Sequence, residues 1–315
     1  MILLLGAGGY VGQAFAAALR ERGWDYRPCS RTGGDYTRFD VLLDLLRKVR
    51  PEFVISAAGF TGKPNVDACE SARAETLLGN TLFPSTLAQA CHAAAVPWGH
   101  VSSGCVYSGA KIVDAAGTRI ETDLTRADVR RLIESNPGVV RGFTEEDEPN
   151  FSFRRPPCSF YSGTKALAEE NVRPLGGGYL WRLRIPFDEV DHPKNYLTKL
   201  LTYPRLYDNF NSLSHRGDFA RACLDLWRLR APFGVYNITN PGYVGTRQVA
   251  DLIQRVLAPD RKFEFWTNDE EFYRVAAKTP RSNCILDCSR LRAAGVQLRG
   301  VEEALEASLN SWSQS

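Results

Sequence analysis

Residues 2–12, ILLLGAGGYVG, indicate the fold most clearly, because four apolar residues run directly into a cluster of glycines. Gly6, Gly9 and Gly12 stand three residues apart, so the spacing is GxxGxxG, and Val11 breaks the GxGxxG frame. Glycines at such a turn let the backbone approach a pyrophosphate, which then lies at the positive end of the following helix. A glycine-rich turn without a ligand is the alternative, but the position directly after an apolar run favours a phosphate loop.

Short apolar runs alternate with helical patterns through the first half of the chain. The predicted strands are 2–5, 25–29, 53–56, 98–101 and 179–185, and the predicted helices are 13–22, 41–49, 81–94 and 161–172. Strands that alternate with helices are typical of a parallel sheet covered on both faces. We therefore predict the α/β class with a doubly wound parallel sheet.

The alternation of strand and helix patterns ends after Pro186, where Gly and Pro residues interrupt longer loops. One further strand is predicted at 235–239 and one helix at 246–257. We expect residues 1–186 to form a nucleotide-binding domain to which 216–244 return, and residues 187–215 and 245–315 to form a smaller substrate-binding lobe.

Residues 112–142 are charged and interrupt the alternation of strands and helices. They contain a helical pattern at 126–134, which we expect Thr125 to cap. The segment looks like an insertion, and we expect it to form a lid or an interface element.

Charge and composition exclude several classes of protein. The chain has 315 residues, and its 39 Lys and Arg against 36 Asp and Glu leave a net charge of +3, too small to imply a nucleic-acid or membrane partner. Its eight cysteines form no CxxC pair and its four histidines are dispersed, so we expect neither a metal site nor a disulfide framework. No apolar stretch is long enough to span a bilayer and no secretory leader is visible, so we expect a cytoplasmic protein.

The end of the second predicted strand bears on the choice of cofactor. An enzyme that prefers NAD places Asp or Glu there to hold the ribose 2′-hydroxyl. This chain has Ser30 and Arg31 instead, with Arg38 nearby. A guanidinium favours the 2′-phosphate of NADP(H), which we predict as the cofactor. A solvated surface arginine is the alternative.

The stretch SFYSGTKALAEE, residues 159–170, places Tyr161 and Lys165 four apart on a predicted helix and therefore on one face. A phenol titrates near pH ~10, too high to act as a base at neutral pH. We expect the Lys165 ammonium to lower the pKa of Tyr161, so that the phenol can exchange a proton with a carbinol oxygen. The alternative is a Tyr and a Lys on a solvated helix face.

Upstream, HVSSGCVYSG (residues 100–109) follows an apolar strand, where polar side chains are expected to line a site. Ser103 is placed to hydrogen-bond a substrate carbonyl oxygen together with Tyr161. If the segment is extended, Ser103 and Cys105 point the same way, because side chains alternate with period two. A thiol there could exchange a proton with the carbon next to the carbonyl. From spacing alone, a small buried hydrophobe is the better interpretation of Cys105.

Eight collinear segments resemble the extended short-chain dehydrogenases that act on nucleotide sugars. They are AAGFTGKPNVDACES (57–71), SGCVY (103–107), FTEEDEPNF (143–151), SFYSGTKA (159–166), RLRIP (182–186), NYLTK (195–199), GVYNITNPG (234–242), and PRSN followed by LD (280–287). The chain most resembles the plant-type nucleotide-rhamnose epimerase/reductases, then the dTDP-4-dehydrorhamnose reductases and, more distantly, the GDP-L-fucose synthases. The resemblance implies a Rossmann-type fold, a C-terminal substrate lobe and a homodimer.

The same resemblance implies a reaction. A UDP- or dTDP-linked 4-keto-6-deoxyhexose would be epimerised at C3 and C5 and then reduced at C4 by NADPH, giving a nucleotide-linked L-rhamnose-type sugar. The 4-keto group acidifies the hydrogens on C3 and C5, and the resemblance assigns the acid/base roles to Cys105 and Lys199. Because the position of Cys105 matches the family, catalysis becomes the favoured interpretation of that residue.

Pattern and resemblance together assign the remaining site residues. The cofactor-binding set is Gly6, Gly9, Tyr10, Val11, Gly12, Ser30, Arg31, Arg38, Ala57, Ala58, Gly59, Thr61 and Lys165. The substrate-binding set is Lys63, Ser103, Asn195, Arg281 and Asn283. Thr61 and Lys63 are expected in the loop after the fourth strand, near the nicotinamide, and Asn195 and Arg281 near the substrate diphosphate.

Three other functions stay open at this point. The chain could be a reductase alone, with Cys105 structural, or an epimerase or dehydratase that retains NAD, against which Arg31 speaks. It could also be a regulatory binding subunit, although such a fold has no need to keep Ser103, Tyr161 and Lys165 together. The longer segment between Ser108 and Phe143 departs from the plant enzymes and puts the sugar product in question.

Overall fold

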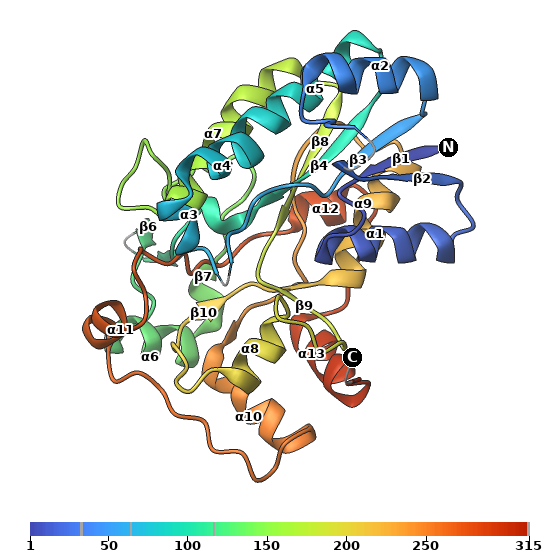
Figure 1. Cartoon of the computed structure of the whole chain (residues 1–315). Coiled ribbons are helices and arrows are strands. Elements are labelled where there is room, and N and C mark those ends of the chain that lie inside the picture. The colour runs from blue at the N-terminus through green and yellow to red at the C-terminus, as the bar shows by residue number, and fades with distance from the viewer. Residues whose placement is uncertain (32–33, 64, 116, 314–315) are drawn as a thin grey trace.

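A parallel sheet of six strands forms the centre of the described part of the chain. We describe the fold from a computed structural model, in which residues 1–31, 34–63, 65–115 and 117–313 are placed (Figure 1). The strands run β12-β8-β4-β3-β1-β2 across the sheet, all parallel. Their bounds are β1 Ile2–Leu5, β2 Tyr26–Cys29, β3 Phe53–Ser56, β4 Trp98–Ser103, β8 Gly178–Leu183 and β12 Gly234–Asn237. The predicted α/β doubly wound fold is confirmed.

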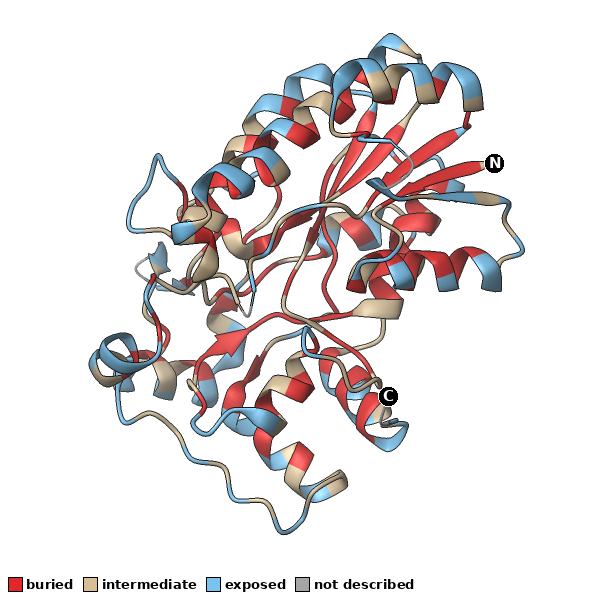
Figure 2. Cartoon of the chain, in the orientation of Figure 1, coloured by how far each residue is buried: buried red, intermediate tan, exposed pale blue. Residues whose placement is uncertain are grey.

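Helices cover both faces of the sheet because its strands are apolar on both sides. In β1, Ile2 and Leu4 pack into one core cluster, whereas Leu3 and Leu5 pack into another. The alternation follows from the period of two in a strand. One face carries α1 (Tyr10–Glu21), α9 (Arg216–Arg228) and α12 (Ser289–Ala293), and the other carries α2 (Phe39–Val49), α5 (Phe83–Ala93) and α7 (Phe160–Val172). Figure 2 shows the buried strands between helices whose outer faces are exposed.

The carboxyl ends of the strands mark the place of the site. In chain order the sheet runs 2-1-3-4-5-6, so the connections from β1 and β3 leave in opposite directions. In doubly wound sheets the crevice at such a switch point binds the ligand. The loop 57–63 begins at this crevice. It follows the third strand of the sheet, so our expectation of a fourth strand there was wrong.

A second group of elements lies below the sheet in Figure 1. Its helices are α8 (Tyr196–Thr202), α10 (Thr246–Val256), α11 (Asp269–Val275) and α13 (Val301–Asn310), and its short strands are β9 (Pro186–Phe187), β10 (Phe210–Asn211), β11 (Ser214–His215) and β13 (Val244–Gly245). Its apolar residues form a cluster of their own, which runs from Phe187 to Leu309 in the sequence.

The charged segment after β4 is an ordered unit. It forms β5 (Ala110–Asp114), β6 (Gly117–Glu121), α6 (Ala127–Ser135) and β7 (Val140–Arg141), with β5 at the centre of an antiparallel ladder. Thr125 does not cap α6, because its backbone N–H and hydroxyl both donate to the Asp123 carboxylate, and Arg126 stands at the N-cap.

Packing shifts two of the expected domain boundaries. The core residues of the charged segment pack against Phe210 and Ile285, and so belong with the lower group of elements. Conversely, Cys288, Leu291 and Val296 pack against the sheet core, although we expected them in the smaller lobe. Residues 314–315 of the expected lobe lie outside the described residues.

The helices of the described residues are too short or too polar to cross a lipid bilayer.

Candidate active site

The glycine loop is shaped for close approach of the backbone. Gly6 has φ +76°, and a Cβ there would lie 2.7 Å from the Ala58 backbone nitrogen. A Cβ on Gly12 would lie 2.0 Å from the Gly6 carbonyl oxygen, to which the Gly9 N–H also donates at 3.0 Å. Side chains at these two positions would fill the turn. The turn is therefore tight, and α1 begins directly after it at Tyr10, so that a pyrophosphate could lie at the N-terminus of this helix.

Tyr10 and Val11 contribute little beyond their backbone to this loop. The Tyr10 hydroxyl donates to Asp188 Oδ1 at 2.9 Å, and its ring stacks on His192 with centroids 4.5 Å apart. Arg216 lies over the other ring face, 4.2 Å from the centroid. The Tyr10 side chain therefore ties α1 to the lower group of elements, and the cofactor contact expected of Tyr10 stays a prediction. Val11 packs against the core of the sheet.

The loop after β3 faces the glycine loop and is held by a buried amide. Asn80, in a π-helical turn before α5, accepts from the Phe60 N–H at 2.9 Å and donates to the Phe60 carbonyl at 2.8 Å. Ala57 and Ala58 are half-buried, whereas Gly59 and Thr61 are exposed. A Cβ on Gly59 would lie 3.6 Å from Lys165 Nζ, so this loop and α7 meet at the crevice.

A small cavity of about 210 Å³ lies beside the end of β2. It is lined by Arg27, Pro28, Cys29, Ser30, Gly34, Tyr36, Val41 and Leu45. Burial raises the pKa of the Tyr36 phenol and the nearby Arg31 charge lowers it, so Arg31 faces this region. Arg38 differs, because it forms a bidentate pair with Asp40 at 3.2 and 2.9 Å. Of the two arginines predicted to bind NADP, Arg31 is therefore the stronger candidate.

Tyr161, Ser103 and Lys165 meet at the carboxyl end of β4. Lys165 is buried and its Nζ donates to the Val101 carbonyl at 3.3 Å. Burial lowers the pKa of Lys165 to about 8, while Glu169 acts in the opposite direction. Burial and the nearby Cys105 raise the pKa of Tyr161, and a hydrogen bond with Ser103 partly offsets this.

This result corrects our expectation for Tyr161. We expected the Lys165 ammonium to lower the phenol pKa, but burial outweighs every charge nearby. The protein thus holds Tyr161 as a neutral phenol, the form that can donate a proton to a developing alkoxide.

Cys105 reaches the same place by a different backbone path from the one expected. Residues Gly104–Val106 form a 3₁₀ turn capped by Ser103, whose hydroxyl accepts from the Cys105 N–H at 3.1 Å. The segment is not extended there, so the argument from alternating side chains does not apply. Cys105 Sγ nevertheless accepts from Arg184 Nη1 at 2.9 Å and lies close enough to Tyr161 to influence its charge.

Arg184 is a buried cation that the sequence analysis missed. It is 2% exposed, and its other guanidinium contacts are the neutral oxygens of Asn211 and the Ser282 carbonyl. Among the described residues no carboxylate pairs with it. A buried charge without a counter-charge is costly, so the site favours a negative charge beside Arg184. A charged residue just after a buried strand was the signal that could have found it.

A buried ion pair connects α7 to β8. Glu169, one turn after Lys165 on α7, pairs with Arg182 at 2.6 Å, and the two side chains are 3% and 0% exposed. Ser102 donates to Glu169 at 2.6 Å, and Arg182 also donates to the Tyr107 hydroxyl at 3.0 Å. Although burial raises it, these contacts hold the pKa of Glu169 below its ordinary value.

Two of the predicted substrate residues, Lys63 and Arg281, form a cationic strip with Lys194 and Lys199. Burial lowers the pKa of Lys199, and the Lys194 and Arg281 charges lower it further. Burial and the charge of Lys63 do the same to the pKa of Lys194. Arg281 Nη2 pairs with Asp67 at 2.6 Å, but its Nη1 is buried without a partner among the described residues. A strip of mutually repelling cations fits a diphosphate.

Asn195 does not belong to this strip. Its side chain is fully buried and caps α8 by accepting from the Leu197 N–H at 3.0 Å. Its amide nitrogen donates to both the carbonyl and the carboxylate of Asp188 and to the Val190 carbonyl. The expected diphosphate contact is therefore corrected to a structural role.

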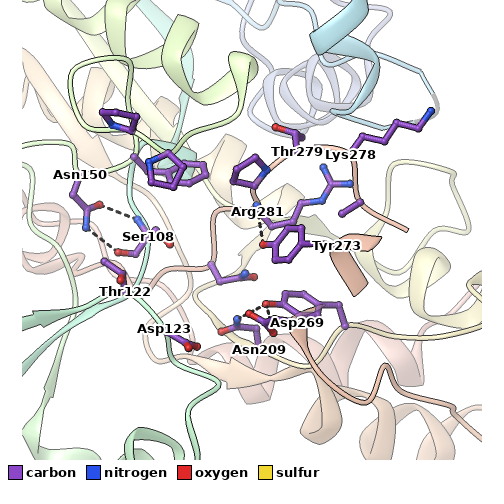
Figure 3. Close-up of a pocket in the computed structure, with 17 residues that line it drawn as sticks. Ser108, Thr122, Asp123, Asn150, Asn209, Asp269, Tyr273, Lys278, Thr279 and Arg281 are labelled. Atoms are coloured by element: carbon purple, nitrogen blue, oxygen red, sulfur yellow. Dashed lines mark hydrogen bonds between the residues drawn. The ribbon is translucent and has the colours of Figure 1, made fainter. Parts of the chain in front are cut away.

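A larger cavity of about 670 Å³ opens beside Arg281 (Figure 3). Arg281 and Asn283 are the predicted substrate residues that line it. Its other walls come from 108–157 and 207–280, and none of their residues was predicted to bind a ligand.

Comparison with known proteins decides the family. The RmlD substrate-binding domain family matches residues 1–314. The chain belongs to the RmlD family. A bifunctional dTDP-4-dehydrorhamnose 3,5-epimerase/dTDP-4-dehydrorhamnose reductase of Arabidopsis thaliana is 29% identical to this RmlD-family chain over 305 residues, which cover 96% of the chain and 90% of that protein.

Longer relatives share the same region. A trifunctional UDP-glucose 4,6-dehydratase/UDP-4-keto-6-deoxy-D-glucose 3,5-epimerase/UDP-4-keto-L-rhamnose-reductase of Arabidopsis thaliana is 30% identical over 266 residues. The match covers 84% of this chain and 35% of that protein, so the RmlD-family chain spans about a third of its length.

Solved structures show the same fold. A UDP-rhamnose synthase from Acanthamoeba polyphaga mimivirus superposes with a TM-score of 0.81 at 21% identity, covering 98% of both chains. A Bacillus anthracis dTDP-4-dehydrorhamnose reductase, solved in complex with NADP, superposes with a TM-score of 0.73 at 18% identity and covers 97% of this chain and 96% of its own. The family resemblance expected from the sequence is confirmed, and the homodimer stays a prediction.

Proposed function

We propose that this chain is an NADPH-dependent 3,5-epimerase/4-reductase of a UDP- or dTDP-linked 4-keto-6-deoxyhexose, forming a nucleotide-linked L-rhamnose-type sugar. The observation that carries the proposal is the meeting of Ser103, Cys105, Tyr161 and Lys165 at the sheet edge where the glycine loop opens. The RmlD family and the printed activities of the Arabidopsis relatives support it.

The reductive half uses the neutral phenol. NADPH supplies the hydride when bound, and the tight glycine turn before α1 would hold its pyrophosphate at the N-terminus of that helix. Ser103 holds the C4 oxygen, and Tyr161 donates its proton to that oxygen as the carbonyl carbon is reduced. Lys165, with its pKa lowered to about 8, is poised to return a proton toward Tyr161 near neutral pH.

The epimerisation step uses the Cys105 thiol and Lys199, whose pKa is lowered by burial. A proton leaves C3 or C5 to a base, and the C–H electron pair passes into an enolate whose oxygen Ser103 and Tyr161 hold. A proton then returns to the opposite face. We assign the two proton-transfer roles to Cys105 and Lys199. Support for Cys105 is Arg184, whose unpaired buried charge would stabilise the thiolate after it forms.

The cofactor assignment predicts a specific loss for Arg31→Ala. The variant should bind NADPH about 10–100-fold more weakly, because charge-assisted hydrogen bonds to a phosphate contribute about 1.5–3 kcal/mol. NADH affinity should be unchanged. Titration of each cofactor by nucleotide fluorescence measures both. Arg38→Ala is the matched control, with a smaller effect because Asp40 already holds that guanidinium. Equal losses for NADPH and NADH would reject the role of Arg31.

The epimerase assignment predicts the behaviour of Cys105→Ser. Its hydroxyl can still accept from Arg184, but it is a far weaker acid than a thiol. Incorporation of solvent deuterium at C3 and C5 should fall by about 10²–10⁴-fold, measured by mass spectrometry of the sugar product. Cys158→Ser, another half-buried cysteine, is the control. Undiminished exchange in Cys105→Ser would leave a reductase alone.

A further inference from the structure

The 670 Å³ cavity has two ends of opposite character. Lys278 and Arg281 supply cations, whereas Asp123 and Asp269 supply carboxylates. Figure 3 shows Asp123, Asn209 and Asp269 together below Arg281. A ligand that spans the cavity therefore meets an anion-binding end and a hydrogen-bond-accepting end.

The two carboxylates face the same space. Asp269 accepts from the Tyr207 hydroxyl at 3.0 Å, and Asp123 Oδ1 accepts from the Thr125 N–H and hydroxyl at 2.9 and 2.6 Å. Burial raises the pKa of Asp269, and the nearby charge of Asp123 adds to the effect. No Lys, Arg or His of the described residues pairs with either. Ionised carboxylates accept hydrogen bonds but do not donate them, so a ligand at this end must supply the donors.

A metal ion is a poor candidate for that ligand. The described residues contain no cluster of three or more His, Cys, Asp or Glu that could hold one. Instead, aromatic side chains flank the carboxylates: Tyr207 and Tyr273 line the cavity, and Tyr207 stacks on Phe272 with centroids 4.0 Å apart. Aromatic surface beside hydrogen-bond acceptors fits a nucleobase joined to a sugar that bears hydroxyl groups.

We infer that this cavity binds the nucleoside half of the substrate and selects a ribonucleotide over a deoxyribonucleotide, with Asp123 and Asp269 accepting from the ribose hydroxyls. The inference rests on the proposed function and deepens it by naming the nucleotide, UDP in preference to dTDP. The diphosphate would reach from this cavity to Arg281 and the cationic strip. Asp123 belongs to the long segment after β4, which thereby acquires a role in substrate selection.

Selection follows from the missing hydroxyl. A 2′-deoxyribose offers one donor fewer, and a carboxylate that has lost its water then stays unpaired. A site built to hydrogen-bond a hydroxyl discriminates strongly against the analogue that lacks it. We expect UDP to bind about 10–100-fold more tightly than dUDP, in line with a hydrogen bond to a charged group.

Calorimetric titration of the whole chain with UDP and with dUDP tests this, without NADPH or sugar. The two ligands differ only in the 2′-hydroxyl, so the base and diphosphate contribute equally. Of Asp269→Asn and Asp123→Asn, the variant that loses the 2′ contact should lower affinity for UDP toward that for dUDP and leave dUDP within about twofold, whereas the variant that loses the 3′ contact should weaken both ligands. Asp128→Asn, an exposed carboxylate on α6 with the same charge change, should behave as wild type.

Each outcome bears on a different claim. Equal binding of UDP and dUDP by the wild-type chain overturns the inference and leaves the proposed function standing. Failure of UDP, dUDP and dTDP alike to bind overturns the proposed function together with the inference. Because the wild-type comparison needs no variant, poor folding of an Asp→Asn variant cannot hide the result.

Discussion

Replacing Tyr161 with Phe is expected to lower the rate of hydride transfer by about 10²–10⁴-fold, the usual contribution of a general acid. The variant keeps the ring and loses only the hydroxyl, which is the proton donor to the C4 oxygen. Single-turnover decay of NADPH absorbance measures the step, and NADPH affinity should change little.

The control for this variant is Tyr26→Phe. Tyr26 lies on β2 and its hydroxyl accepts from Arg20 at 2.9 Å, so this variant removes a tyrosine hydroxyl far from α7. Its rate should match the wild-type rate. Near-normal turnover in Tyr161→Phe would remove Tyr161 from the chemistry and with it the basis of the reductive half.

Replacing Glu169 with Gln is expected to destabilise the chain by about 3–5 kcal/mol, because it leaves Arg182 buried without a counter-charge. Denaturation in urea, followed by circular dichroism, measures the loss as a lower midpoint. Glu170→Gln is a matched control at the next position. Glu170 pairs with Arg154, which is 73% exposed, and such surface pairs contribute about 0–1 kcal/mol.

The pH dependence of this loss has a definite sign. The pKa of Glu169 is lowered in the folded chain, so the ionised carboxylate stabilises the fold above its unfolded pKa of about 4.3. This contribution disappears as the pH falls through the lowered folded pKa. The difference between wild type and Glu169→Gln should therefore be full at neutral pH and shrink in acid. Similar midpoints for Glu169→Gln and Glu170→Gln at neutral pH would show that the buried pair with Arg182 does not stabilise the fold.

Local patterns carried the prediction of the fold. The apolar run before Gly6 and the alternation of strands with helices sufficed for the doubly wound sheet, and the strand Phe53–Ser56 was predicted to the residue. Helix starts were less accurate: α1 begins at Tyr10 because Gly12 lies inside the helix against the loop, where the sequence favoured a turn.

What the sequence missed depends on tertiary packing. Tyr10 and Asn195 both bind Asp188, which lies 178 residues from Tyr10 and 7 residues from Asn195. The pattern of the sequence does not reveal these contacts. The neutral state of Tyr161 follows from its burial. Arg184 is held beside Cys105 by Asn211 and Ser282, which lie 27 and 98 residues away in the sequence. The larger cavity brings together Asp123 and Asp269, which are 146 residues apart in the sequence.

The reaction itself shows whether the chain both epimerises and reduces a 4-keto sugar. The purified chain is mixed with NADPH and UDP-4-keto-6-deoxyglucose in deuterated water, and NADPH absorbance and the mass of the sugar product are followed together. We expect loss of one NADPH per sugar and deuterium at both C3 and C5. Stable NADPH with an unlabelled sugar, for this substrate and for its dTDP counterpart, would contradict this expectation.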